Sequence, residues 1–342
     1  MLPRRTAPRW VRATAVFGAS AIAVLSLQAS SSAQPRPSVA EVAARVDALN
    51  EQAEAIAEQF NASGIALTAA QRAASVAEAR VARAEAALTL QKRRLGSIAA
   101  AAYRNGGVGG TTALMISSNP QDYLNQATTL DRISARGADR MRALRVASLR
   151  VSQAKAEAKA QVAAVRAINA SIAAKRTQVN ALLAQAESLL AGLRSDERAR
   201  LAALRRAAAA RASRSEPRFK FNGPASARAR IAIDFAMSQR GKPYHWGSSG
   251  PSSYDCSGLT MRAYAHAGIS LDHYTGSQWH AGRHVGRSEL RPGDLVFFYS
   301  DHHHVGIYIG GGQMVHAPHT GDVVRVASID GRSFSGGVRL VG

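Results

Sequence analysis

The chain has 342 residues, of which 46% are hydrophobic and only 6% aromatic, and its formal net charge at pH 7 is +21. This length exceeds what one compact core usually organises, so we expect more than one structural region. A mean hydropathy of −0.14 excludes a polytopic membrane protein and a wholly disordered chain. The single cysteine excludes an intramolecular disulfide framework and a cysteine-rich zinc module. The positive charge indicates a polyanionic neighbour, such as nucleic acid, an anionic membrane face or a cell-wall polymer.

Charge and chemically reactive side chains are distributed unevenly. Most of the excess positive charge lies before residue 223, in sequence rich in alanine and arginine. All ten histidines and the only cysteine lie at or beyond His245. Proline and glycine residues interrupt helical periodicity between the two parts. We therefore predict a basic helical region over 38–212, a linker over 213–224 and a chemically active domain over 225–342.

The first 33 residues are typical of an export signal. Arginines without acidic residues precede an apolar run, Ala13–Leu27, which is too short for a membrane span. Ser31, Ser32 and Ala33 then supply the small residues that a signal peptidase recognises. We expect residues 1–33 to be a signal peptide and the mature protein to be secreted; an uncleaved N-terminal anchor is the alternative.

Residues 38–212 have the periodicity of a long helical hairpin. Apolar residues at its start recur at steps of three and four, as in a coiled-coil seam: Val39, Val42, Val46, Leu49, Ala53, Ile56 and Phe60. Glycines after Asn105 end this helix, and Asn119-Pro120 begins a second one. We expect the second helix to continue to about Ala212. The two helices would form an antiparallel coiled coil with its tip at about 105–120.

The hairpin is either a spacer or a docking arm. Apolar residues at its predicted tip, Ala113–Ile116, favour docking, because inert surface rarely gathers such residues. A nucleic-acid role is disfavoured, since the arginines are spread around alanine-rich helices with almost no interleaved aromatic residues. We expect no nucleic-acid partner.

The C-terminal region contains a cysteine placed for nucleophilic chemistry. Ser226–Gln239 predicts an amphipathic helix, and a second helix opens at Asp255 and ends at Gly268. Cys256 then lies in the first turn, where unpaired N–H groups and the helix dipole stabilise a thiolate. The thiolate is the form that attacks carbonyl carbon. We expect Asp255 to point away from the sulfur and to cap or position the loop.

A base for this cysteine is predicted on a β-hairpin downstream. Short strands are expected at 293–299, 304–309, 313–317 and 323–327. If Ile309 pairs with Gln313, Gly306 faces His316, and His304 lies diagonal to His316 on the same face. His304 would then take the proton of Cys256, and His316 would fix its tautomer. Amides at the helix N-terminus, with the Tyr244 hydroxyl, would stabilise the oxyanion.

These residues also have plainer interpretations. A lone cysteine is usually a buried hydrophobe, although its polar, glycine-flanked turn disfavours that here. The pair His302 and His304 resembles half of the zinc site of cell-wall metallo-endopeptidases. Those enzymes also need a histidine followed four residues later by aspartate, which this sequence lacks, so we expect neither a metal ion nor a cofactor. Tyr244 and Trp246 suit the walls of a cleft or ordinary packing.

Five ordered motifs in this region resemble one known family. They are YHWG at 244–247, DCSGL at 255–259, RPGDLVFF at 291–298, HVGIYIG at 304–310 and VHAP at 315–318. They are similar to the NlpC-type cell-wall cysteine peptidases. The resemblance implies an α+β fold: a papain-like catalytic domain with helices packed on a small antiparallel sheet, preceded here by the long coiled-coil hairpin.

The resemblance also implies an activity and a set of site residues. The activity is D,L-endopeptidase cleavage of peptidoglycan stem peptides, most often at the γ-D-glutamyl–meso-diaminopimelate bond. Motif position makes Cys256 the nucleophile, His304 the base and His316 the orienting residue. Candidates for contact with the substrate or oxyanion are Tyr244, Trp246, Asp255 and Ser257. Ser248 departs from the family, which often has a second glycine there.

The hairpin is similar to the coiled coils of actinobacterial Rip-type and CwlO-type hydrolases. Such coils dock on membrane ABC transporter complexes of the FtsEX kind, which implies a role in cell-wall remodelling or cell separation and a cell-wall location. Whether the coil shields Cys256 stays open at this point. The alternative function is a non-catalytic protein that binds muropeptides, or activates a hydrolase, with the same cleft.

Overall fold

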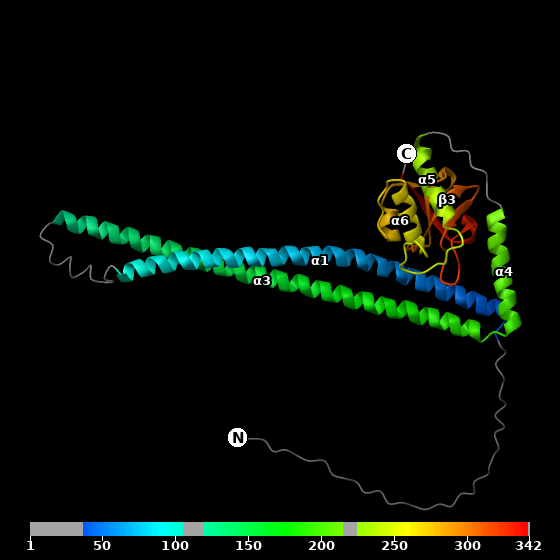
Figure 1. Cartoon of the computed structure of the whole chain (residues 1–342), viewed down its shortest axis with the longest axis horizontal. Coiled ribbons are helices and arrows are strands. Elements are labelled where there is room, and N and C mark those ends of the chain that lie inside the picture. Colours follow the sequence, from blue (N-terminus) through cyan, green and yellow to red (C-terminus); the bar gives the residue numbers. More distant parts are fainter. Residues whose placement is uncertain (1–36, 105–119, 215–223, 341–342) are drawn as a thin grey trace, which may run out of the picture. The chain divides into compact units, whose positions relative to one another are not determined.

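The computed structural model describes residues 37–104, 120–214 and 224–340. The predicted signal peptide, the predicted hairpin tip over 105–119 and linker residues 215–223 lie outside the described residues. Two long helices, α1 (Val39–Arg104) and α3 (Pro120–Ala191), lie side by side and run antiparallel (Figure 1). The predicted helical hairpin is therefore confirmed. No helix in the described part is both long and apolar enough to cross a bilayer.

Small apolar side chains form the contact between the two helices. The buried members are Val42, Val46, Ala53 and Ala57 of α1, and Val179 and Ala186 of α3. Their small size lets the two backbones approach closely, which explains how so long a hairpin packs with few aromatic residues. Exposed ion pairs join the helices farther along, between Arg80 and Glu157 at 2.6 Å and between Lys155 and Glu85 at 2.8 Å.

The second arm of the hairpin does not continue to Ala212 as one helix, so that prediction is wrong. It ends at Ala191, and a separate helix α4 spans Ser195–Arg214. Gly192 weakens the helix at this point, and the Glu197 carboxylate accepts a hydrogen bond from the Arg194 amide at 2.8 Å, which caps the new N-terminus. Leu193 and Leu201 then pack on Val42 and Val46 near the start of α1.

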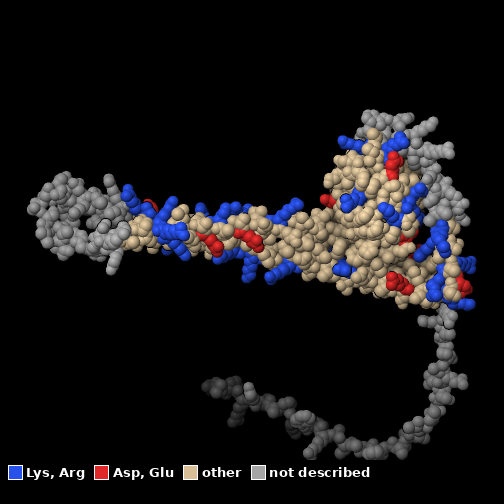
Figure 2. Space-filling view, viewed as in Figure 1, with Lys and Arg blue, Asp and Glu red and all other residues tan. Residues whose placement is uncertain are grey.

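Lysine and arginine side chains border both edges of the hairpin in the view of Figure 2, with fewer acidic groups between them. They are not gathered into one continuous stripe. Such dispersed positive charge suits diffuse, salt-sensitive attraction to a polyanion better than one specific docking site.

The C-terminal region is an α+β domain in which helices pack on an antiparallel sheet, as expected. Its helices are α5 (Pro224–Ser238), α6 (Cys256–His266) and α7 (Thr275–Trp279). The strands are β1 (Arg283–Val285), β2 (Leu295–Phe298), β3 (His304–Gly310), β4 (Gln313–His316), β5 (Arg325–Ser328) and β6 (Phe334–Arg339). They are ordered β1-β6-β2-β3-β4-β5, with 3₁₀ turns at Arg287–Glu289 and Ile329–Gly331. In Figure 1, α5 and α6 lie beside β3.

The β3–β4 hairpin has the register that the sequence predicts near the histidines. Ile307 pairs with Val315, but at the turn Gly310 rather than Ile309 pairs with Gln313, because a bulge shifts the register there. A Cβ atom on Gly306 would lie 3.2 Å from the His316 Cβ and 2.7 Å from the Met314 sulfur. Glycine at this position therefore leaves the space that the two imidazoles need.

A buried ion pair fixes the strand next to β3. Asp294, just before β2, accepts hydrogen bonds from Arg339 of β6 at 2.8 and 2.7 Å. Both side chains are buried. Because β2 pairs directly with β3, this ion pair supports the strand that carries His304.

We expect Asp294→Ala to lower the free energy of unfolding by about 3–5 kcal/mol, because it leaves the Arg339 charge buried without its partner. The matched control is Asp234→Ala on α5, which removes an exposed carboxylate 3.7 Å from Arg230. That change should cost less than about 1 kcal/mol. Urea unfolding followed by tryptophan fluorescence measures both, and equal losses in the two variants would contradict the assignment.

Candidate active site

The cysteine lies at the start of helix α6, buried beneath the surface. Cys256 is the first residue of α6, and only 1% of its surface is exposed. Asp255 is the N-cap residue, and one carboxylate oxygen accepts a hydrogen bond from the Gly258 amide at 2.7 Å. The same carboxylate lies 2.7 and 2.9 Å from Nε2 of His273. Asp255 is thus held by the helix terminus and by the imidazole of His273.

Two buried histidines on the β3–β4 hairpin face each other. Nε2 of His304 lies 2.8 Å from Nδ1 of His316, a hydrogen bond in which one nitrogen donates and the other accepts. Burial lowers the pKa of both imidazoles well below the usual value, with nearby positive charge adding to the effect. Both rings are therefore neutral, and Nδ1 of His304 faces away from His316.

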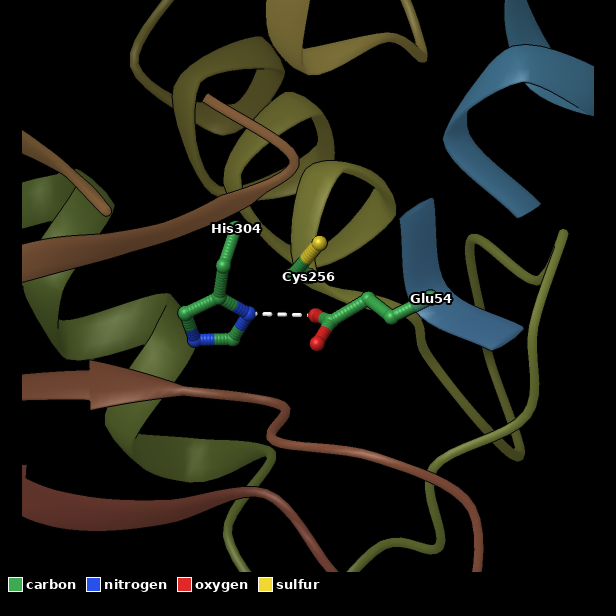
Figure 3. Close-up of side chains that lie close together, drawn as sticks. All are labelled: Glu54, Cys256 and His304. Carbon is green, nitrogen blue, oxygen red and sulfur yellow. Dashed lines mark hydrogen bonds and ion pairs between the residues drawn. The ribbon is translucent and has the colours of Figure 1, made fainter. Parts of the chain in front are cut away.

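A glutamate from the helical hairpin forms a hydrogen bond with Nδ1 of His304. Glu54 of α1 points its carboxyl group at Nδ1 of His304 and forms a short hydrogen bond with it (Figure 3). Glu54 is 3% exposed, and burial raises its pKa to about 7. Because burial disfavours charge on both partners, the neutral carboxyl and neutral imidazole are favoured over an ion pair. The nitrogen that would accept the thiol proton is already engaged.

Glu58, one turn farther along α1, binds the first turn of α6. One carboxylate oxygen accepts a hydrogen bond from Ser257 Oγ at 2.7 Å and lies 3.7 Å from the Cys256 sulfur. The other oxygen accepts from the Thr275 amide at 2.7 Å. Burial, reinforced by the negative charge of Asp255, raises the pKa of Glu58 to about 7.

Further contacts extend this interface along α1. The Asn61 side chain donates to Asp255 at 3.2 Å. The Phe60 ring meets the Trp246 ring edge-on, with ring centroids 5.2 Å apart. Phe60, which the sequence predicts as a residue of the coiled-coil seam, thus contacts the C-terminal domain. We call the buried residues on this face the polar stripe of α1: Asn50, Glu54, Glu58 and Asn61.

Three of the residues that the sequence predicts for the site lie together in the structure. Cys256, His304 and His316 form the buried centre, and Tyr244 is buried nearby, where desolvation raises the pKa of its hydroxyl well above 10. Trp246 and Ser257 line the interface with α1. The His302 ring stacks on the Trp279 ring, with ring centroids 4.0 Å apart.

Sequence reasoning missed the polar stripe. Its members recur at steps of four, four and three, which is the spacing of one helix face. Glutamates on long helices are usually solvated, however, so this spacing alone does not distinguish an exposed face from a buried one. The contact joins residues about 250 positions apart, and no local pattern reports it.

The chemical state of the sulfur follows from this enclosure. Burial raises the pKa of Cys256 well above its usual value, and negative charge on the neighbouring Glu58 and Asp255 side chains adds to the effect. The protonated thiol is consequently favoured while α1 covers the surface formed by Cys256 and His304, which we call the cleft. We call this arrangement, with Glu54 bound to Nδ1 of His304, the closed state.

Comparison with known proteins finds a family match within the C-terminal domain. Residues 241–339 match the NlpC/P60 family. A probable endopeptidase of Mycobacterium tuberculosis is 48% identical over 98 residues, which are 29% of this chain and 26% of that protein. The peptidoglycan endopeptidase RipA of Mycolicibacterium smegmatis is 44% identical over 107 residues, 27% of this chain and 22% of RipA. The chain thus spans about a quarter of the length of these curated relatives.

Solved structures give a similar result. The peptidoglycan hydrolase RipB from Mycobacterium tuberculosis is 30% identical, with a TM-score of 0.33, over 36% of this chain and 75% of that one. The NlpC/p60 domain of the peptidoglycan hydrolase SagA is 35% identical, with a TM-score of 0.31, over 32% of this chain and 97% of that one.

The closed state predicts slow alkylation of Cys256 in the native protein. Placing two positive charges on the polar stripe, Glu54→Lys with Glu58→Lys, should expel α1 from the cleft, because burial of two ammonium groups carries a large desolvation cost. Reaction with iodoacetamide should then accelerate by about tenfold or more. Because the chain contains a single cysteine, the measured alkylation rate reports on Cys256 alone.

The matched control makes the same change of charge on exposed positions of α1, Glu78→Lys with Glu85→Lys, and should alkylate at the native rate. Rapid alkylation of the unaltered protein, matching that of the stripe variant, would show that the cleft is open in solution.

Proposed function

We propose that this chain, whose residues 241–339 form an NlpC/P60 domain, is an exported cysteine endopeptidase that cleaves the peptide stems of peptidoglycan. The observation that carries the proposal is the constellation at the β3–α6 contact. The Cys256 sulfur lies within 4.8 Å of a His304 ring nitrogen, and the other ring nitrogen of His304 is held by His316. This is the order of nucleophile, base and orienting group that acyl transfer needs.

The chemistry follows from these positions once Glu54 leaves. Nδ1 of His304 takes the thiol proton, and the thiolate attacks the scissile carbonyl carbon. Amides at the N-terminus of α6 stabilise the oxyanion of the tetrahedral intermediate. His304 returns the proton to the departing amine, which leaves a thioester on Cys256. A water molecule deprotonated by His304 then hydrolyses this thioester and regenerates the thiol.

The finer assignment concerns the bond and the location. The motif resemblance supports the γ-D-glutamyl–meso-diaminopimelate bond as the target, and the relatives named as peptidoglycan endopeptidases support a cell-wall substrate. The positive charge of the chain favours retention in an anionic wall. We place the protein outside the cytoplasm, associated with the cell wall, in remodelling or cell separation.

In this proposal, the helical hairpin inhibits the peptidase domain of the same chain. Substrate and the polar stripe of α1 need the same space, and Glu54 competes directly with the thiol for His304. Activity therefore requires α1 to withdraw. The resemblance of the hairpin to Rip-type and CwlO-type coils supports a membrane complex of the FtsEX kind as the partner that withdraws it.

The first prediction of this proposal compares full-length variants on a defined tripeptide muropeptide, with products weighed by mass spectrometry. Glu54→Lys with Glu58→Lys should cleave faster than the unaltered chain, whereas Glu78→Lys with Glu85→Lys should not. Equal rates in all three proteins would contradict inhibition by α1.

The second prediction separates an enzyme from a binding protein. Within the Glu54→Lys, Glu58→Lys background, Cys256→Ala should reduce cleavage by about 10³-fold or more, and His304→Ala by roughly 10²–10⁴-fold. Both proteins should keep the circular dichroism spectrum of their parent. Muropeptide binding without turnover in the parent itself would favour the non-catalytic alternative.

A further inference from the structure

Three potential metal ligands converge in the closed state. Among the residues that the structure describes, Glu54, Cys256 and His304 place a carboxylate oxygen, a sulfur and an imidazole nitrogen within 4.8 Å of one another. All three side chains are buried, with 3%, 1% and 0% of their surface exposed. Two of these residues belong to the catalytic domain and one to the hairpin (Figure 3).

The donor set suits zinc. Zn²⁺ binds cysteine sulfur, histidine nitrogen and carboxylate oxygen, whereas Mg²⁺ and Ca²⁺ prefer oxygen ligands alone. In a tetrahedral zinc site the ligand atoms lie roughly 3.3–3.6 Å apart. The three donor atoms lie within 4.8 Å of one another, and the ion would replace the proton between Glu54 and His304 and move these two side chains apart. A water molecule would complete the fourth position.

A second observation points to the same place. The other carboxylate oxygen of Glu54, Oε2, is buried and has no hydrogen-bond partner among the described residues. A buried oxygen of this kind costs free energy unless something satisfies it. The His304 ring is already oriented by His316 at 2.8 Å on its far nitrogen, which is how proteins fix the imidazole ligands of zinc.

Charge also balances at this position. Binding of Zn²⁺ displaces the proton of the Cys256 thiol and the proton shared by Glu54 and His304 to solvent. The resulting complex of one thiolate, one carboxylate, one neutral imidazole and Zn²⁺ has no net charge. A neutral complex avoids the desolvation cost that a lone thiolate or carboxylate would meet in this buried site.

We propose that Zn²⁺ binds to Glu54, Cys256 and His304 when α1 lies in the cleft, and that the ion locks the peptidase closed. Coordination would occupy the nucleophile and the base at once and would tie the hairpin to the catalytic domain. The consequence for activity rests on the proposed function, whereas the site itself does not.

The test uses the full chain freed of metal by a chelator. Titration with Co²⁺ should give one equivalent of binding, with a near-ultraviolet sulfur-to-metal absorption band and visible bands of a four-coordinate ion. Competition with a chromophoric chelator then measures Zn²⁺ affinity. Glu54→Gln keeps the size of the side chain and removes the carboxylate, and it should weaken Zn²⁺ binding by about 100-fold or more.

The matched control is Glu58→Gln, the same change one turn away on the polar stripe, which should weaken Zn²⁺ binding by less than about tenfold. Cys256→Ser should abolish the sulfur band. Zn²⁺ should inhibit muropeptide cleavage by the unaltered chain at concentrations that leave Glu54→Gln active.

Two results would overturn the proposal. One is absence of the sulfur band in the unaltered chain, and the other is equal Zn²⁺ affinity in the unaltered chain and Glu54→Gln. If the metal bands appear as expected and no variant cleaves muropeptide with or without chelator, the site stands and the proposed peptidase function fails.

Discussion

The contact between the Glu54 carboxyl group and His304 joins the helical hairpin to a buried imidazole of the C-terminal domain. A cysteine nucleophile depends on an imidazole that is free to accept its proton, and here a carboxyl group from another part of the chain holds that nitrogen. Burial favours the neutral form of each partner, so the sulfur remains a thiol. In the proposed function, withdrawal of Glu54 and Glu58 together with α1 would leave His304 free to accept the thiol proton.

Helix α1 joins two interfaces that have different physical origins. Its apolar residues, such as Val46 and Ala53, pack on α3 with no polar atoms to satisfy, so this contact tolerates small shifts. Its polar stripe contacts the cleft through directional hydrogen bonds from Glu54 and Glu58. Directional contacts are lost over a short displacement, whereas apolar packing weakens more gradually. In the proposed function, the polar stripe would leave the cleft while the hairpin stays paired.

The parts of the site that sequence predicts are those with local signals. Cys256 follows a helix-capping aspartate, and a run of glycines defines the hairpin that brings His304 near His316, so short-range rules suffice. The bulge at Gly310 and the short strand β1 depend on packing between distant segments, and periodicity alone does not report them. The break after Ala191 has local causes, Gly192 and the Glu197 cap, but helical periodicity on both sides of it favoured one continuous helix. The polar stripe is the clearest case of a missing signal, because its glutamates look like those of any solvated helix until the partner surface is known. Family motifs cover the C-terminal domain, and the contact between Glu54 and His304 reaches outside them.

The length of α1 has a mechanical consequence. From Glu54 to Arg104 the helix continues for about 75 Å at its regular rise per residue, and α3 stiffens it as a paired rod. Glu54 lies close to the opposite end, so a displacement applied near Arg104 would be transmitted along the paired helices to the contact with His304.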